Sequence, residues 1–149
     1  MLKTILVTIL AVVSSNAMAE WVEVDGDDVM NLTIYADPST IIKRDSMVII
    51  SVLYDYKKIQ RDDNLPPFLS NIYQEEYDCN ELRTKSITSS DFSKNMGKGV
   101  EKNTDKEING EWNSIEPDSH GEALWEFACK KSRKLEHPTI FERIEKAVK

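Results

Sequence analysis

The fold of this chain is organised around Tyr73-Gln74-Glu75-Glu76-Tyr77-Asp78-Cys79 and a distant second cysteine, Cys129. Apolar and polar residues alternate through residues 70–79, which predicts a strand that ends at Cys79. Cys129 is predicted to end a helix. Because these are the only two cysteines of the 149 residues, a bond between them would join a sheet to the helix that packs on it.

The first nineteen residues have the anatomy of a cleaved secretory signal. A short positive segment at residues 1–3 precedes an apolar run at 4–13 and a small, polar segment that ends in Ala-Met-Ala. We expect export and cleavage after Ala19. The apolar run is shorter than the about 20 residues that span a bilayer, which argues against the alternative of an uncleaved anchor. No cysteine follows the run to accept a lipid, and no later segment is apolar enough to span a membrane.

The charge of the chain limits which classes of partner it can bind, and its predicted compartment decides what the two cysteines do. The chain carries a net charge of −7, and removal of the signal takes away one positive residue, Lys3. An acidic domain of this size repels phosphate backbones and anionic head groups, which argues against nucleic acid and membrane surfaces. In an exported protein, two cysteines most simply form a disulfide, whose loop of about 50 residues corresponds to about 4 kcal/mol of stability. Two unrelated buried thiols are the alternative.

Alternation and turn residues predict further strands along the chain. We expect an edge strand at 20–24 with a turn at 25–28, a second strand at 32–36 that Asp37-Pro38 stops, and a central strand at 47–56. Residues 57–69 are predicted to be an exposed linker, with a partner-binding loop as the alternative. A strand with one solvent-exposed face is predicted at 82–90, and it is followed by a glycine-bearing bend at 92–100.

The C-terminal part is predicted to be helical. Ser119 and Glu122 fit a capping box, and the helix that follows has an apolar face that includes Trp125 and, one turn later, Cys129. Residues 131–149 form a separate segment, with a basic run and then an amphipathic helix from Pro138. That second helix docks on a partner or on a second copy in a homodimer, or it packs on its own domain, and the sequence leaves these alternatives open.

The sequence shows no arrangement of residues that predicts catalysis. His120 and His137 have no cysteine or second histidine at metal-ligand spacing, although one of them with carboxylates remains an alternative. There is no Gly-x-Ser-x-Gly elbow and no Cys-x-x-Cys. A carboxylate pair brought together by the fold stays open. We therefore expect a protein that is not an enzyme and that uses no metal or cofactor.

Several stretches, taken in order, resemble the bacterial surface-adhesin protein E-like family. They are EWVEV at 20–24, YADPSTI at 35–41, LYDYKKIQ at 53–60, EYDC at 76–79, NMGKG at 95–99, and Trp112 followed by GEALW at 121–125 and Cys129. The resemblance covers about residues 20–130, which we treat as one domain. It implies an α+β fold, in which an antiparallel sheet of about six strands is backed by a C-terminal helix and Cys79 is bonded to Cys129.

The resemblance also carries expectations about function. It implies a Gram-negative protein of the periplasm, the cell surface or the medium, and the family's named member is an outer-membrane adhesin for host matrix and plasma proteins. That adhesin is lipid-anchored and its ligand-binding region is basic, and this chain differs in both features. It has no lipid-acceptor cysteine, and its segment before Tyr73 has no basic residue after Arg61. A family fold does not by itself decide the ligand. The residues that bind the ligand are therefore not predicted.

Two hypotheses follow. The first is an exported, non-enzymatic binding module that recognises an extracellular or envelope protein. The alternative is a periplasmic structural or accessory domain with no host ligand.

Overall fold

The computed structural model describes residues 19–62, 65–105, 108 and 110–136. The predicted signal, apart from Ala19, and the predicted second helix from Pro138 lie outside these residues. The elements in chain order are β1 (Val22–Asp27), β2 (Leu32–Arg44), β3 (Met47–Asp62), β4 (Leu65–Asp78), β5 (Arg83–Phe92), β6 (Glu101–Asp105), β7 (Asn113–Ser114) and α1 (His120–Glu136).

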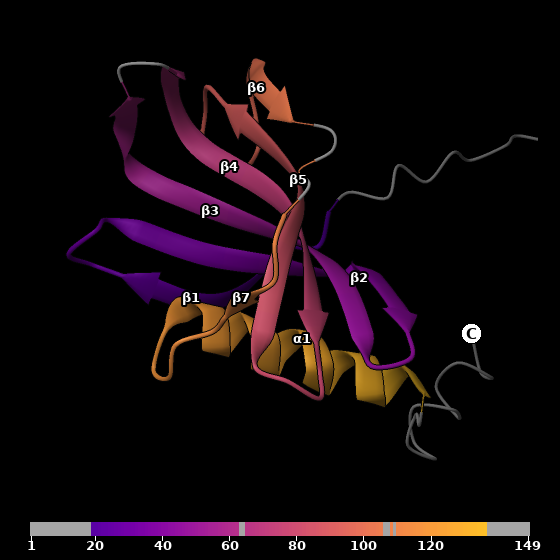
Figure 1. The fold of residues 1–149 in the computed structure, drawn as a ribbon. Coiled ribbons are helices and arrows are strands. Elements are labelled where there is room, and N and C mark those ends of the chain that lie inside the picture. Colours follow the sequence, from indigo (N-terminus) through magenta and orange to yellow (C-terminus); the bar gives the residue numbers. More distant parts are fainter. Residues whose placement is uncertain (1–18, 63–64, 106–107, 109, 137–149) are drawn as a thin grey trace, which may run out of the picture.

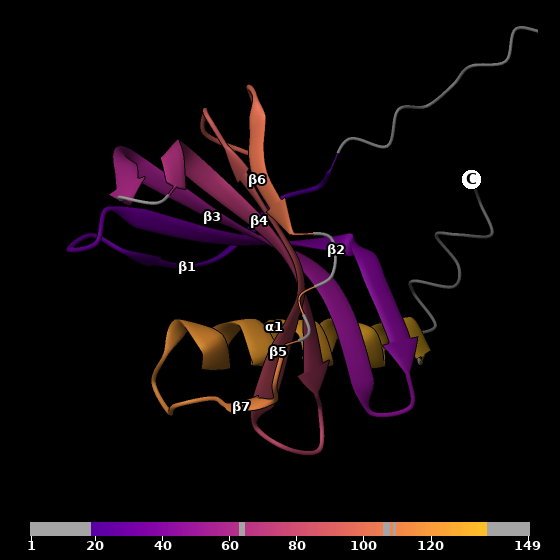
Figure 2. The same cartoon turned by 45° about the horizontal axis from the view of Figure 1, so that its top comes forward.

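The strands form one antiparallel sheet in the order β1-β2-β3-β4-β5-β6, and the short β7 pairs with β5. Each strand therefore lies next to its neighbour in the sequence, as hairpin connections produce. The helix α1 forms a second layer against one face of this twisted sheet, as Figures 1 and 2 show. The predicted α+β class, with about six antiparallel strands backed by a C-terminal helix, is confirmed.

The hydrophobic core lies between α1 and the sheet. Successive side chains of a strand point to opposite faces. In β3, Val48, Ile50 and Val52 all point toward this core and are fully buried. Leu53 is also fully buried but lies on the other face. The predicted central position of β3 is confirmed, and both of its faces are apolar at the middle of the strand. The core is completed by Leu32, Ile34, Ala36, Tyr77, Ile115, Leu124, Ala128 and Cys129.

The prediction that Asp37-Pro38 ends the second strand is wrong, because β2 continues to Arg44. The register shifts between Asp37 and Ile42, so the extra residues form a bulge within the strand. The Thr40 hydroxyl accepts a hydrogen bond from the Ser51 amide at 2.9 Å, and the Asp37 carboxylate accepts one from the Ser39 amide. A bulge tolerates a residue without an N–H, so the proline does not have to stop the strand.

The predicted linker at 57–69 is also wrong, because these residues belong to a hairpin. β3 runs to Asp62 and β4 begins at Leu65, with Gln60 opposite Phe68. The ladder is irregular here, since its register shifts twice between Asp55 and Asp62. Irregular pairing accommodates two prolines that cannot donate ladder hydrogen bonds.

Smaller differences concern the ends of elements. β1 continues to Asp27, so the first turn lies at residues 28–31 rather than 25–28. The glycine-bearing bend after β5 is confirmed at residues 93–100. The segment after it, which the sequence left unassigned, forms β6.

The helix α1 begins at His120, as the capping residues predict. The Ser119 hydroxyl accepts a hydrogen bond from the Glu122 amide at 3.3 Å, whereas the Glu122 carboxylate accepts one from the Asp118 amide rather than from Ser119. The prediction that the helix ends at Cys129 is wrong, because it continues to Glu136. The residues that follow Cys129 are good helix formers, and the first proline after them is Pro138.

Candidate binding surface

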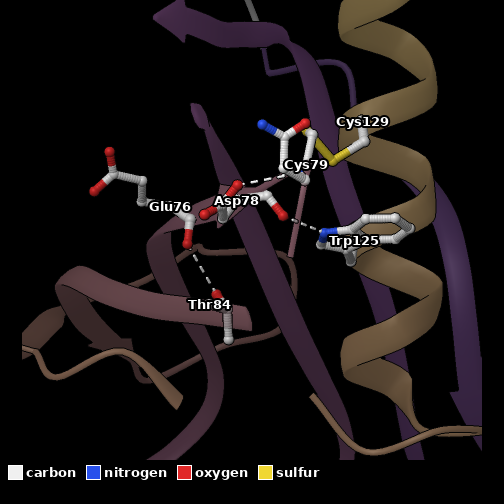
Figure 3. Close-up of a disulfide and its surroundings, with 7 residues drawn as sticks. Glu76, Asp78, Cys79, Thr84, Trp125 and Cys129 are labelled. Atoms are coloured by element: carbon white, nitrogen blue, oxygen red, sulfur yellow. Dashed lines mark hydrogen bonds between the residues drawn. A yellow bond between two sulfur atoms is a disulfide. The ribbon is translucent and has the colours of Figure 1, made fainter. Parts of the chain in front are cut away.

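The two cysteines identified in the sequence form the bond that holds the helix on the sheet. The sulfur atoms of Cys79 and Cys129 are 2.06 Å apart, and Figure 3 shows the bond bridging the end of β4 and the middle of α1. One turn earlier in α1, the indole Nε1 of Trp125 donates a hydrogen bond to the Asp78 carbonyl at 2.7 Å. A covalent bond and a hydrogen bond therefore attach the same two segments.

Strand register sorts the remaining side chains onto two faces, since residues directly opposite each other in an antiparallel pair share a face. One face packs against α1, and we call the other the open face. The open face is formed by Met47, Ile49, Ser51 and Leu53 of β3, Ile72, Gln74, Glu76 and Asp78 of β4, and Arg83, Lys85, Thr88, Ser90 and Phe92 of β5.

One end of the open face carries a cluster of charges around an indole ring, which we call the Trp112 cluster. The guanidinium of Arg83 lies 4.8 Å from the ring centroid of Trp112, and the ammonium of Lys85 lies 4.9 Å from it. Arg83 also pairs with Asp78 at 2.8 Å, and Lys85 pairs with Glu76 at 2.7 Å. These contacts hold the half-buried indole in one orientation, which preorganises it for binding.

The opposite end of the open face is held by the loop between β5 and β6. The Met96 amide donates to Asp55 Oδ1 at 2.6 Å, and the Gly97 amide donates to the Ser70 hydroxyl at 3.0 Å. Gly97 has a φ of 64°, and a Cβ atom there would lie 2.6 Å from Ile72 Cδ1. The loop can approach Ile72 this closely only because the residue is glycine.

A shallow groove of about 380 Å³ lies on the open face, and we call it the open-face groove. It reaches from β3 to β6, and its lining contains two large apolar side chains, Ile72 and Phe92, with polar residues around them. The polar residues are Ser51, Gln74, Thr88, Ser90, Thr104 and Asp105. The sequence had predicted one wet face for this strand region, and the register identifies that wet face as the open face.

Two buried carboxyl groups lie on the face that packs toward α1. Burial raises the pKa of Glu75, while hydrogen bonds from Ser86 and Thr84 oppose that rise. Asp91 accepts hydrogen bonds from the side-chain amides of Asn71 and Asn103.

These two carboxyls do not form a catalytic pair. Asp91 lies opposite Asn71, four residues along β4 from Glu75, which corresponds to about 13 Å of strand. Glycosidase carboxyl pairs are about 5–10 Å apart.

The sequence left a metal site formed by one histidine and carboxylates as an alternative, and His120 does lie beside two carboxylates. Nδ1 of His120 lies 2.7 Å from Asp25 Oδ2, and its Nε2 lies 3.8 Å from Asp27 Oδ2, so the two carboxylates approach different ring nitrogens. The hydrogen bond with His120 lowers the pKa of Asp25. His137 lies outside the described residues, and within those residues no group of three or more His, Cys, Asp or Glu side chains is placed to hold a metal ion. His120 thus ties the start of α1 to β1.

A protein-family model and solved structures both relate this chain to surface-adhesin protein E. The family model described as "Surface-adhesin protein E" matches residues 21–130. No curated protein matches the sequence significantly. Within the described part of the chain, no helix is both long enough and apolar enough to cross a membrane.

Several solved structures of Haemophilus influenzae protein E match this chain. Its selenomethionine form superposes with a TM-score of 0.57 at 13% identity, covering 74% of this chain and 85% of that chain. Crystal form II gives 0.56 at 14% identity, covering 75% and 97%. Protein E from a non-typeable strain gives 0.55 at 12% identity, covering 83% and 82%. At identities this low, the superpositions show a shared fold and nothing about a shared function.

Sequence reasoning missed the Trp112 cluster and the open-face groove. Arg83 and Lys85 stand two residues apart in a predicted strand, which indicates one face, but nothing near them in the sequence indicates Trp112. The register shift between Gln74 and Glu75 also displaces the alternation on β5, so the cluster residues Arg83 and Lys85 and the groove residue Thr88 share a face without following one simple period.

Proposed function

Because this chain belongs to the surface-adhesin protein E family, we propose that it is an exported, non-enzymatic binding module that recognises an extracellular or envelope protein through its open face. The family match over residues 21–130 carries this proposal. The predicted signal at residues 1–19 supports export into the envelope or onto the surface of a Gram-negative cell.

The Trp112 cluster is the part of the open face best suited to a protein partner. Tryptophan and arginine are the residues most enriched among those that dominate binding energy, and they act from positions that are already ordered. Trp112 is half-buried and held by Arg83 and Lys85, so its ring loses little freedom when a partner covers it. Rim charges that are already paired, as here with Asp78 and Glu76, contribute orientation more than affinity.

The location of the protein is tested on whole cells. Protease is added to intact and to lysed cells, and the fragmentation of the protein is followed with an antibody. We expect digestion on intact cells. Protection until lysis would instead favour a periplasmic accessory domain and would contradict recognition of a host protein.

The binding surface is tested with purified mature protein on immobilised matrix and plasma proteins. Trp112→Ala is expected to weaken binding by about 30-fold, which corresponds to the about 2 kcal/mol of a dominant interface residue. Trp21→Ala is the matched control, because Trp21 is also half-buried but precedes β1 at the other edge of the sheet. Equal effects of the two variants would exclude the Trp112 cluster as the contact.

A further inference from the structure

We propose that the open-face groove is a second binding site and that its ligand is a neutral saccharide. The groove lies along β5 between the Trp112 cluster and the β5–β6 loop, and its lining residues in β3, β4 and β5 belong to the open face. The proposal is independent of the protein partner proposed above, because it concerns different residues and can be tested with free sugars.

The first observation is unused hydrogen-bonding capacity. The side chains of Ser51, Gln74, Thr88 and Asp105 all line the groove, and none of them makes a hydrogen bond to another described side chain or backbone group. Elsewhere on the same face polar side chains are paired, as in Lys85 with Glu76 and Arg83 with Asp78. The groove therefore offers hydroxyl, carboxamide and carboxylate groups that no described residue satisfies and that a ligand can bind.

The second observation is the mixture of chemistry in so small a space. Hydroxyl and carboxamide groups both donate and accept, which matches the hydroxyls around a sugar ring. Ile72 and Phe92 add apolar surface, against which the C–H face of a pyranose can pack. A volume of about 380 Å³ lies at the small end of ligand pockets, which suits one or two sugar rings better than a folded protein segment.

The charge of the groove selects among saccharides. Among the lining residues that the structure describes there is no lysine or arginine, and the two cations of the Trp112 cluster, Arg83 and Lys85, are already engaged with carboxylates. Asp105 is the one charged residue of that described lining, and it is negative. Sialylated, sulfated and phosphorylated sugars would meet repulsion from Asp105 and from the acidic chain, with no compensating cation among the described lining residues, so the ligand is a neutral sugar.

The test begins with the mature protein on an array of neutral, sialylated and sulfated oligosaccharides. A retained sugar is then titrated in free form by calorimetry against the wild type and the double variant Gln74→Ala/Thr88→Val. We expect neutral sugars to be retained, and the double variant to bind at least about tenfold more weakly because two hydrogen bonds are lost.

The control variant is Gln60→Ala. Gln60 is also a sheet glutamine, but its side chain bonds the Lys58 carbonyl on the hairpin arm of β3, away from the groove. We expect it to bind sugars as the wild type does. Thermal melting of each variant confirms that the fold is intact, and Gln74 is exposed, so its truncation leaves the core unchanged.

Three outcomes would overturn the proposal: no retained sugar, retention of anionic sugars alone, or equal titration of the groove variant and the wild type. These outcomes are separate from failure of the proposed function. If no sugar is retained on the array while a matrix protein still binds and Trp112→Ala weakens that binding, the protein partner stands and the saccharide site does not.

Discussion

The two faces of the sheet are made by alternate residues of the same strands, yet α1 covers one of them and leaves the other open. Val48, Ile50 and Val52 of β3 are buried under α1, and the disulfide attaches the helix to that side. The neighbouring Ser51 points to the open face, where the groove and the paired charges lie. The covered face supplies apolar burial, whereas the open face supplies exposed hydrogen-bonding groups.

If the open face binds the partner as we propose, this difference separates the residues that stabilise the fold from those that bind. Apolar burial and one covalent link on the covered face supply much of the favourable free energy of folding. The open face then carries polar side chains whose replacement costs little stability, because surface substitutions usually change it by less than about 0.5 kcal/mol. Variants on the two faces should therefore separate into those that unfold the protein and those that alter binding.

The largest expected effect is loss of the disulfide. Cys79→Ser and Cys129→Ser should each lower the free energy of unfolding by about 4 kcal/mol, because each removes the same link across a 50-residue separation. Urea unfolding measures this loss. Wild type treated with a reductant should fall to the stability of the variants. Unequal losses in the two variants would mean that the bond is not the shared cause.

Core truncation on the covered face should come next. Leu124 of α1 is 2% exposed, so Leu124→Ala should cost about 3 kcal/mol from lost burial and the cavity left behind. The matched change Ile42→Ala, at a side chain that is 50% exposed, should cost less than about 0.5 kcal/mol. Thermal and urea melts compare the two. A similar loss in the free energy of unfolding at both positions would show that burial under α1 does not decide how much a side chain contributes to stability.

The β5–β6 loop, which holds one end of the open face, also contains a position where stability is at stake. Gly97→Ala should cost about 1–2 kcal/mol, because the residue has positive φ and its new methyl group would collide with Ile72. Gly26→Ala in β1 is the matched control, since the nearest atom to its new Cβ is 3.4 Å away. Urea unfolding of both variants tests the difference. A neutral Gly97→Ala would show that the loop does not depend on close approach to Ile72.

The smallest expected effect depends on pH and concerns Glu75. Burial raises the pKa of its carboxyl above the ordinary 4.5, so the folded state binds the proton more tightly than the unfolded state. Its contribution to stability is therefore complete below pH 4.5 and is lost as pH rises through the raised pKa. Glu75→Gln should be more stable than wild type at pH 7 and should show a flatter dependence of stability on pH.

Melting temperatures between pH 4.5 and pH 7 measure this effect. Glu23→Gln, at an exposed carboxylate of β1, is the control and should follow the wild-type curve. A Glu75→Gln variant that is less stable than wild type at pH 7 would show that the hydrogen bonds from Ser86 and Thr84 outweigh the cost of burying the charge.

Much of the fold could be predicted because its signals are local. The alternation of residues 47–56 predicted the central strand, and Ser119 predicted the start of the helix. The wrong predictions at Pro38 and at 57–69 have one cause. The rules that proline ends a strand and that a charged segment is a linker consider one segment at a time and ignore support from the neighbouring strand. In the folded protein, Thr40 bonds to Ser51 of the next strand, and the two arms of the β3–β4 hairpin support each other.

The candidate binding surface could not be predicted, because its residues meet only through strand pairing. Trp112 reaches Lys85 from a segment 27 positions away along the chain, and the groove joins side chains from β3, β4, β5 and β6. A bulge that displaces the register by one residue moves side chains to the other face. Such bulges occur in β2 and β5 pairings here, and no local pattern revealed them.

The sequence by itself determined the period of each strand, the start of the helix, the single pair of cysteines and the resemblance to a family. These properties depend on covalent order and on neighbours within a few residues. Only the tertiary structure decided which alternate residues lie under α1 and which form the open face, the Trp112 cluster and the groove. The reason is that strand register and helix placement minimise the free energy of the whole domain, through contacts between residues far apart in the chain.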